Sequence, residues 1–71
     1  MVLNEEQAKK LLTGNYTFSM WSLSMLITRL KGVYTGNPSE TVLGSCVGEL
    51  NAFMKKFAKI MGSDYAIIEQ L

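Results

Sequence analysis

The sequence lacks histidine and contains only one cysteine, Cys46, and one proline, Pro38. A single cysteine excludes an internal disulfide, and without histidine the commonest general base and a common zinc ligand are missing. Charged residues make up 18% of the 71 residues and the formal net charge is +1, so no strong positive field points to nucleic acid. We therefore expect a protein that is not an enzyme and needs no metal or cofactor, and a nucleic-acid partner is not favoured.

Long hydrophobic runs are missing too. The most apolar window, residues 18–27, is about half the length that spans a bilayer, and it contains three serines. The first residues, Met-Val-Leu-Asn-Glu-Glu, are acidic where a signal peptide is basic. We therefore expect a cytoplasmic protein without a membrane segment.

Hydrophobic residues, in contrast, make up 48% of the chain. The length fits one domain, residues 1–71. A domain this small buries a low fraction of its surface and is marginal without a disulfide, a metal or a partner. The composition therefore predicts that the chain associates with further copies of itself, as a dimer or a higher homo-oligomer.

Helical spacing of apolar residues predicts an all-α fold, because no segment alternates with period two for long. A first short helix covers residues 4–12, with Asn4 and Gln7 at capping-box spacing. Gly14 is expected to end it in the left-handed conformation. A second, long helix covers residues 17–33.

The turn Thr35-Gly36-Asn37-Pro38-Ser39 separates the second helix from the third, because Pro38 cannot continue a helix and Ser39 can cap the next one. The third helix covers residues 40–61 and has one continuous apolar stripe that includes Cys46, which is expected to act as a small hydrophobic residue. Ser63 and Asp64 begin a last short helix. The two long helices are expected to form an antiparallel hairpin flanked by the short ones, which becomes bundle-like on oligomerisation.

The second helix has apolar residues on two sides. One side is a broad stripe, and Phe18, Trp21 and Met25 fall elsewhere on the cylinder. We expect these three residues to form a surface for another subunit or partner. Tyr16, Phe18 and Trp21 also form an aromatic cluster, for which stacking on a nucleobase is the alternative.

The third helix carries Gly44, Gly48 and Ala52 on the side opposite its stripe. Each internal glycine costs a helix about 1 kcal/mol relative to alanine. Three interpretations remain open: close packing of another backbone on the glycines, simple tolerance of the glycines, or a crevice for a ligand.

Lys55, Lys56 and Lys59 lie near the end of the same helix, and Lys55 and Lys59 continue the glycine side. They favour either a site for a small anion such as a phosphate or nucleotide, or simple complementation of the helix dipole.

Two families of small helical hairpins resemble this chain. The Asn37-Pro38-Ser39 turn and the ending Ala-Ile-Ile-Glu-Gln-Leu resemble needle subunits of type III secretion systems, which implies a filament. The size and the Ala52-Phe53-Met54 step resemble short phage proteins that sequester cyclic nucleotide signals of bacterial immunity, a resemblance that covers about a third of the chain and implies a sponge for a small anionic ligand. No residue role is transferred from either family.

Three functions therefore stay open. The first is a homo-oligomeric, phage- or plasmid-type regulatory module that binds a larger protein through Phe18, Trp21, Met25, Gly44 and Gly48. The second is an oligomeric binder of a small anion, such as a cyclic nucleotide, that uses Lys55, Lys56, Lys59 and the two glycines. The third is a filament or assembly subunit.

Overall fold

The computed structural model describes residues 2–56 and 62–71, and these residues form four helices without a strand. Helix α1 spans Glu5–Thr13, α2 spans Trp21–Gly36, α3 spans Glu40–Lys56 and α4 spans Gly62–Glu69. The predicted all-helical class is confirmed. The last part of the predicted third helix, residues 57–61 with Lys59, lies outside the described residues.

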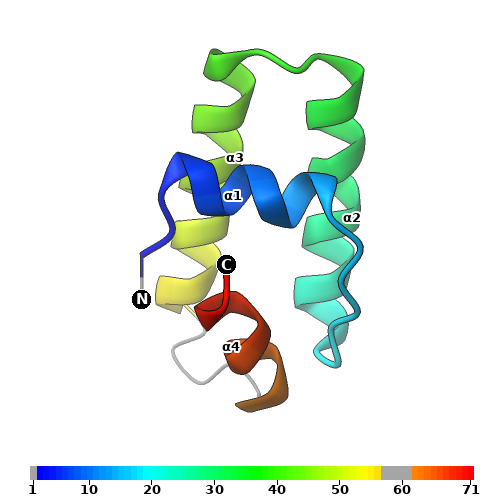
Figure 1. Ribbon diagram of the computed structural model, residues 1–71, viewed down its shortest axis with the longest axis vertical. Coiled ribbons are helices and arrows are strands. Elements are labelled where there is room, and N and C mark those ends of the chain that lie inside the picture. The colour runs from blue at the N-terminus through cyan, green and yellow to red at the C-terminus, as the bar shows by residue number, and fades with distance from the viewer. Residues whose placement is uncertain (1, 57–61) are drawn as a thin grey trace.

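The two longer helices, α2 and α3, run in opposite directions, and α1 crosses in front of both of them (Figure 1). Helix α4 lies at the end of the molecule away from the 37–39 turn. The described chain measures 31 × 20 × 20 Å along its principal axes. One side of the α2–α3 layer is therefore covered by α1, and we call it the α1 side; the other we call the far side.

Helix α1 begins with the predicted capping box. The backbone N–H of Gln7 donates to Oδ1 of Asn4, and the backbone N–H of Asn4 donates to Oε1 of Gln7. The prediction for Gly14 was wrong, because its φ of −86° is not left-handed. A Cβ at Gly14 would overlap the Tyr16 ring and the Lys10 carbonyl oxygen, so this position needs a glycine for space.

Helix α2 begins at Trp21, four residues later than predicted. Its N-cap residue, Met20, has no side chain that can cap a helix. Asp64 of α4 instead holds the two residues just before the helix, because it accepts hydrogen bonds from the backbone N–H groups of Ser19 and Met20. A contact supplied from a distant segment leaves no local sequence signal, which explains the wrong boundary.

The turn between α2 and α3 is confirmed at Ser39. Helix α2 continues through Gly36, so its end lies three residues beyond the prediction. The backbone N–H of Val42 donates to Oγ of Ser39, and that of Leu43 donates to the Ser39 carbonyl oxygen. Pro38 stands between the two helices because its ring has no N–H to donate.

The core lies where α1, α2 and α3 meet. The residues predicted for the apolar face of α1 are all buried, and so is Cys46 in the middle of α3. Helical spacing predicts Val33 on the broad apolar stripe of the second helix and Tyr34 as its extension, but Val33 is 47% exposed and only Tyr34 is buried. The buried apolar residues are Leu3, Ala8, Leu11, Leu12, Phe18, Leu23, Ile27, Leu30, Tyr34, Leu43, Cys46, Leu50, Met54 and Ile68.

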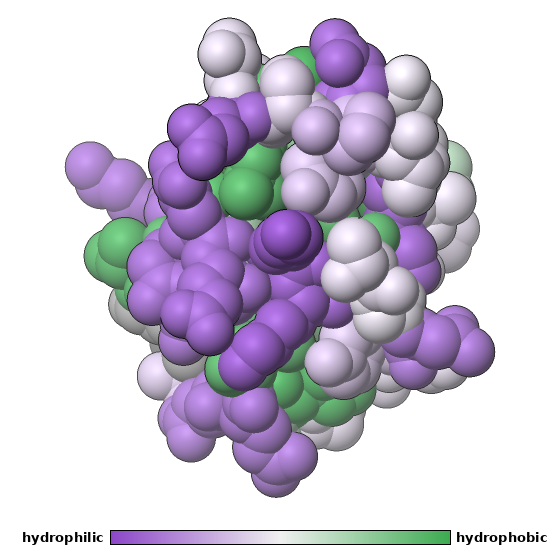
Figure 2. All heavy atoms as spheres, turned by 45° about the horizontal axis from the view of Figure 1, so that its top comes forward, coloured by the Kyte–Doolittle hydropathy of each residue, from purple (hydrophilic) through white to green (hydrophobic). Residues whose placement is uncertain are grey.

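Figure 2 looks at the α1 side from above and shows hydrophilic side chains over much of this face, with hydrophobic ones in separate small patches. The candidate site is defined by the larger exposed apolar side chains of α2, Trp21 and Met25.

Candidate functional site

Trp21 and Met25 are the most exposed apolar side chains of α2. They lie one turn apart, with 75% of Trp21 and 53% of Met25 accessible to solvent. Both stand on the side of the helix away from Leu23, which is buried in the core. The structure thus places two of the three predicted interface residues of this segment together at the surface.

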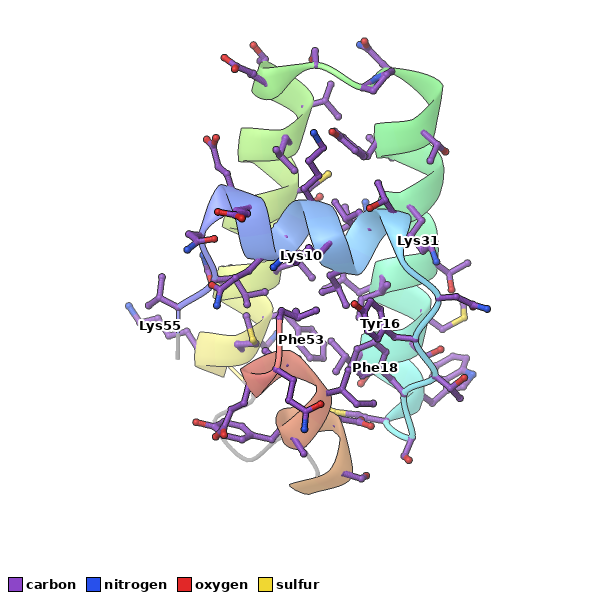
Figure 3. The ribbon with its side chains drawn as sticks, viewed as in Figure 1. Lys10, Tyr16, Phe18, Lys31, Phe53 and Lys55 are labelled. Carbon is purple, nitrogen blue, oxygen red and sulfur yellow. The ribbon has the colours of Figure 1, made fainter. Side chains whose placement is uncertain are left out.

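Phe18 is a correction to the predicted surface. It is only 8% exposed and belongs to the chain's own core. Because α2 begins at Trp21, Phe18 lies in the non-helical segment before the helix. The helical spacing that placed Phe18 on a separate side from the broad apolar stripe of α2 therefore does not apply to it. Figure 3 shows Phe18 close to α2, below Tyr16, which is itself partly exposed. Phe18 is therefore not available to a partner.

Gly44 and Gly48 are both exposed on α3. A Cβ built on either of them would meet no described atom within 4 Å. Close packing of the described part of the chain on these glycines, one of the three interpretations, is therefore not the reason for them. Tolerance and contact with something outside the chain remain.

Lys55 shares this side of α3 with the two glycines. It is exposed, and Figure 3 shows it pointing away from α2. Lys56 is exposed as well but lies about 100° further around the helix. Of the predicted anion-binding set, the structure therefore brings Gly44, Gly48 and Lys55 onto one face, with Lys56 at its margin, and Lys59 lies outside the described residues.

One ion pair joins α2 to α3 within the described residues. The Arg29 guanidinium lies 2.8 Å from a carboxylate oxygen of Glu49, and both side chains are about half exposed. The hydrogen bond to Glu49, and the negative charge of Glu49, raise the pKa of Arg29 above its usual value. A solvent-exposed ion pair stabilises a fold only weakly. This pair lies on the far side of the α2–α3 layer.

Two other polar contacts mark the α1 side. The Lys31 ammonium group donates to the carbonyl oxygen of Gly14 at 2.6 Å. Asn51 of α3 exchanges two hydrogen bonds with the backbone of Leu3, accepting from its N–H at 2.7 Å and donating to its carbonyl oxygen at 3.0 Å. These contacts attach both ends of α1 to the two long helices.

Asp64 is fully buried, and sequence reasoning missed its role. We interpreted it as the beginning of its own helix, but α4 already begins at Gly62. Its two oxygens lie 2.7 Å from the nitrogen of Ser19 and 2.8 Å from that of Met20. No local sequence pattern indicates this role, because the two partners of Asp64 lie 45 and 44 positions away along the chain.

Cys46 lies in the core of α3 as predicted, with 1% of its surface exposed. Burial, with the nearby negative charge of Glu49, raises the pKa of its thiol. At neutral pH the sulfur is therefore protonated, and a protonated, buried thiol is a poor nucleophile. The arrangement gives Cys46 a packing role.

The described residues contain no group of three or more histidine, cysteine, aspartate or glutamate residues arranged to hold a metal ion. Among them, no helix combines the length and apolar character needed to cross a membrane.

Comparison with protein-family models, with curated proteins and with solved structures gives no match for this chain.

Proposed function

We propose that this chain is a small non-enzymatic interaction module that works as a homo-oligomer and binds a larger protein. The exposure of Trp21 and Met25 on one face of α2 is the observation that carries the proposal. Tryptophan and methionine are enriched at the centres of protein interfaces, and a tryptophan left mostly in water is unusual in a monomer.

Burying about 200 Å² of tryptophan surface contributes about 5 kcal/mol before the costs of association are subtracted. The total accessible surface of the chain is 4568 Å². A standard interface covers about 800 Å² per partner, so one helix face with its flanks is enough for a specific contact.

Sedimentation velocity across a micromolar concentration series tests self-association. We expect the mean mass to rise with concentration above the 7.9 kDa of one chain. Met25→Lys, which places a charge in the exposed apolar face, is expected to lower the mass at every concentration. A single 7.9 kDa species throughout the series contradicts the proposal.

A second candidate is a binder of a small anion such as a cyclic nucleotide. It is favoured by one observation, namely that Gly44, Gly48 and Lys55 share one exposed face of α3. A ligand at about 100 times its Kd stabilises the folded chain by about 2.7 kcal/mol. Thermal unfolding with a panel of cyclic nucleotides and phosphate tests it, with Lys55→Gln as the variant that loses the effect. If no compound raises the melting temperature, this candidate fails and the interaction module stands.

A further inference from the structure

The exposed face of α2 points along the α2–α3 layer, away from α3. On a helical cylinder Trp21 lies about 80° from Lys31 in one direction and about 80° from Arg29 in the other. Lys31 contacts the backbone on the α1 side, and Arg29 contacts Glu49 on the far side. Trp21, with Met25 beside it, therefore lies midway between the two sides, and we call this surface the α2 edge.

The glycine face of α3 occupies the equivalent place at the opposite end of the layer. Gly48 lies about 60° from Asn51 in one direction and about 100° from Glu49 in the other. Asn51 contacts Leu3 on the α1 side, whereas Glu49 contacts Arg29 on the far side. Gly44, Gly48 and Ala52 are exposed between them. We call this surface the α3 edge.

The two edges are complementary in charge. The only charged residues of α2 are Arg29 and Lys31, and they flank the α2 edge. The only charged residues in the first eleven positions of α3 are Glu40 and Glu49, and they flank the α3 edge in the same way. On the far side Arg29 and Glu49 are already paired within the chain, so the charges left to match between two copies are Lys31 of α2 and Glu40 of α3, both toward the α1 side.

The two edges are complementary in shape as well. The α2 edge presents the large side chains of Trp21 and Met25. The α3 edge presents two glycines over which no described atom lies within 4 Å of an added Cβ. Small residues at this spacing let a neighbouring helix approach closely.

We propose that the α2 edge of one copy packs on the α3 edge of the next copy, with the two helices antiparallel, as α2 and α3 already are within one chain. The proposal rests on the self-association proposed above and specifies its geometry. A symmetric dimer brings the same surface of both copies together, whereas this contact joins two different edges. The contact is therefore head to tail.

The glycines and the charges of the α1 side agree on one register of this contact. With Met25 of one copy between Gly44 and Gly48 of the next, the antiparallel helices bring Lys31 opposite Glu40 on the α1 side. Arg29 and Glu49 keep the ion pair that joins them within each chain.

In a head-to-tail chain of copies, one terminal copy has a free α2 edge and the other has a free α3 edge. Only a closed ring uses every edge. The chain therefore forms closed rings larger than a dimer or open filaments, depending on the rotation between neighbours.

Two single variants and their mixture test this geometry. Met25→Lys blocks the α2 edge and Gly48→Arg blocks the α3 edge, and both place a good helix former at an exposed position. Asn15→Lys, exposed and outside both edges, adds one positive charge as the matched control. Circular dichroism and thermal unfolding of each variant confirm that it folds.

Native mass spectrometry then counts the subunits. We expect wild type and Asn15→Lys to form species larger than dimers, and each blocked variant alone to be monomeric. An equal mixture of the two blocked variants is expected to form a one-to-one heterodimer, because each supplies the edge that the other lacks.

Two results overturn the head-to-tail contact in different ways. A wild-type dimer that Met25→Lys breaks and Gly48→Arg leaves intact shows a symmetric contact through the α2 edge, and self-association itself then stands. A wild-type chain that is monomeric at all concentrations overturns both the contact and the proposed self-association.

Discussion

Asp64 and Ser19, 45 positions apart, are joined by a hydrogen bond of 2.7 Å from the Ser19 backbone N–H to the buried carboxylate. The second carboxylate oxygen accepts from Met20. One side chain of α4 thus holds the two residues before α2 and fixes the last helix against the rest of the fold. The edge that carries Trp21 begins directly after these two residues.

Removal of this buried carboxylate is expected to be strongly destabilising. In Asp64→Ala, two partly buried N–H groups lose their acceptor, and we expect the free energy of unfolding to fall by about 3 kcal/mol. Asp64→Asn keeps one acceptor oxygen and is expected to cost about half as much. Urea denaturation measures both, with Glu69→Gln as the exposed control on the same helix. Equal stability of Asp64→Ala and wild type would show that the carboxylate does not hold α4 in place.

The double hydrogen bond between Asn51 and Leu3 should attach the segment before α1 to α3. Asn51→Ala leaves the Leu3 N–H and carbonyl groups without this partner, and we expect a loss of about 2 kcal/mol in unfolding free energy. The matched control is Asn15→Ala, at an exposed position. An identical cost for the two variants would contradict the assignment.

The exposed and the enclosed glycines should respond to alanine with opposite signs. A Cβ at Gly44 or Gly48 meets no described atom within 4 Å, so alanine there is expected to raise the unfolding free energy of the monomer by about 1 kcal/mol. Gly14→Ala drives a methyl group against the Tyr16 ring and the Lys10 carbonyl, and should lower it by about 2 kcal/mol. Denaturation in dilute solution separates these effects from assembly, and stabilisation by Gly14→Ala would refute the packing described for that residue.

Burial of Cys46 predicts a loss of stability in alkaline solution. The pKa of its thiol is raised in the folded state above its ordinary value of about 9. Once the pH passes that ordinary value, the unfolded chain releases the proton while the folded chain keeps it, so the free energy of unfolding falls as pH rises. Below it both states hold the proton and this contribution is constant. Cys46→Ala should therefore show a shallower decline above about pH 9 than wild type, and parallel curves would contradict the assignment.

Local signals in the sequence were sufficient for the helices and for much of the core. The capping box of Asn4 and Gln7, the Ser39 cap and the buried face of α1 all depend on residues within a few positions of one another. Their physical causes act along one helix, and periodicity detects them. Trp21 and Met25 could be assigned to the surface for the same reason.

Contacts between distant segments were not predictable in this way. The boundary at Trp21 depends on Asp64, and Phe18 turned inward because the chain leading into α2 is not helical. Glycine is needed at residue 14 because the ring of Tyr16 leaves no space for a Cβ, and not because of a left-handed φ. Which residues of α2 and α3 lie on the α1 side likewise depends on distant contacts, those of Lys31 with Gly14 and of Asn51 with Leu3.

The emission of Trp21 tests the central claim most directly, because it is the only tryptophan in the chain and it lies on the α2 edge. We expect its emission maximum to move to shorter wavelength as the protein concentration rises, since association takes the indole out of water, and to stay at long wavelength in Gly48→Arg. An emission maximum that stays at long wavelength over the whole concentration range would contradict assembly through this residue.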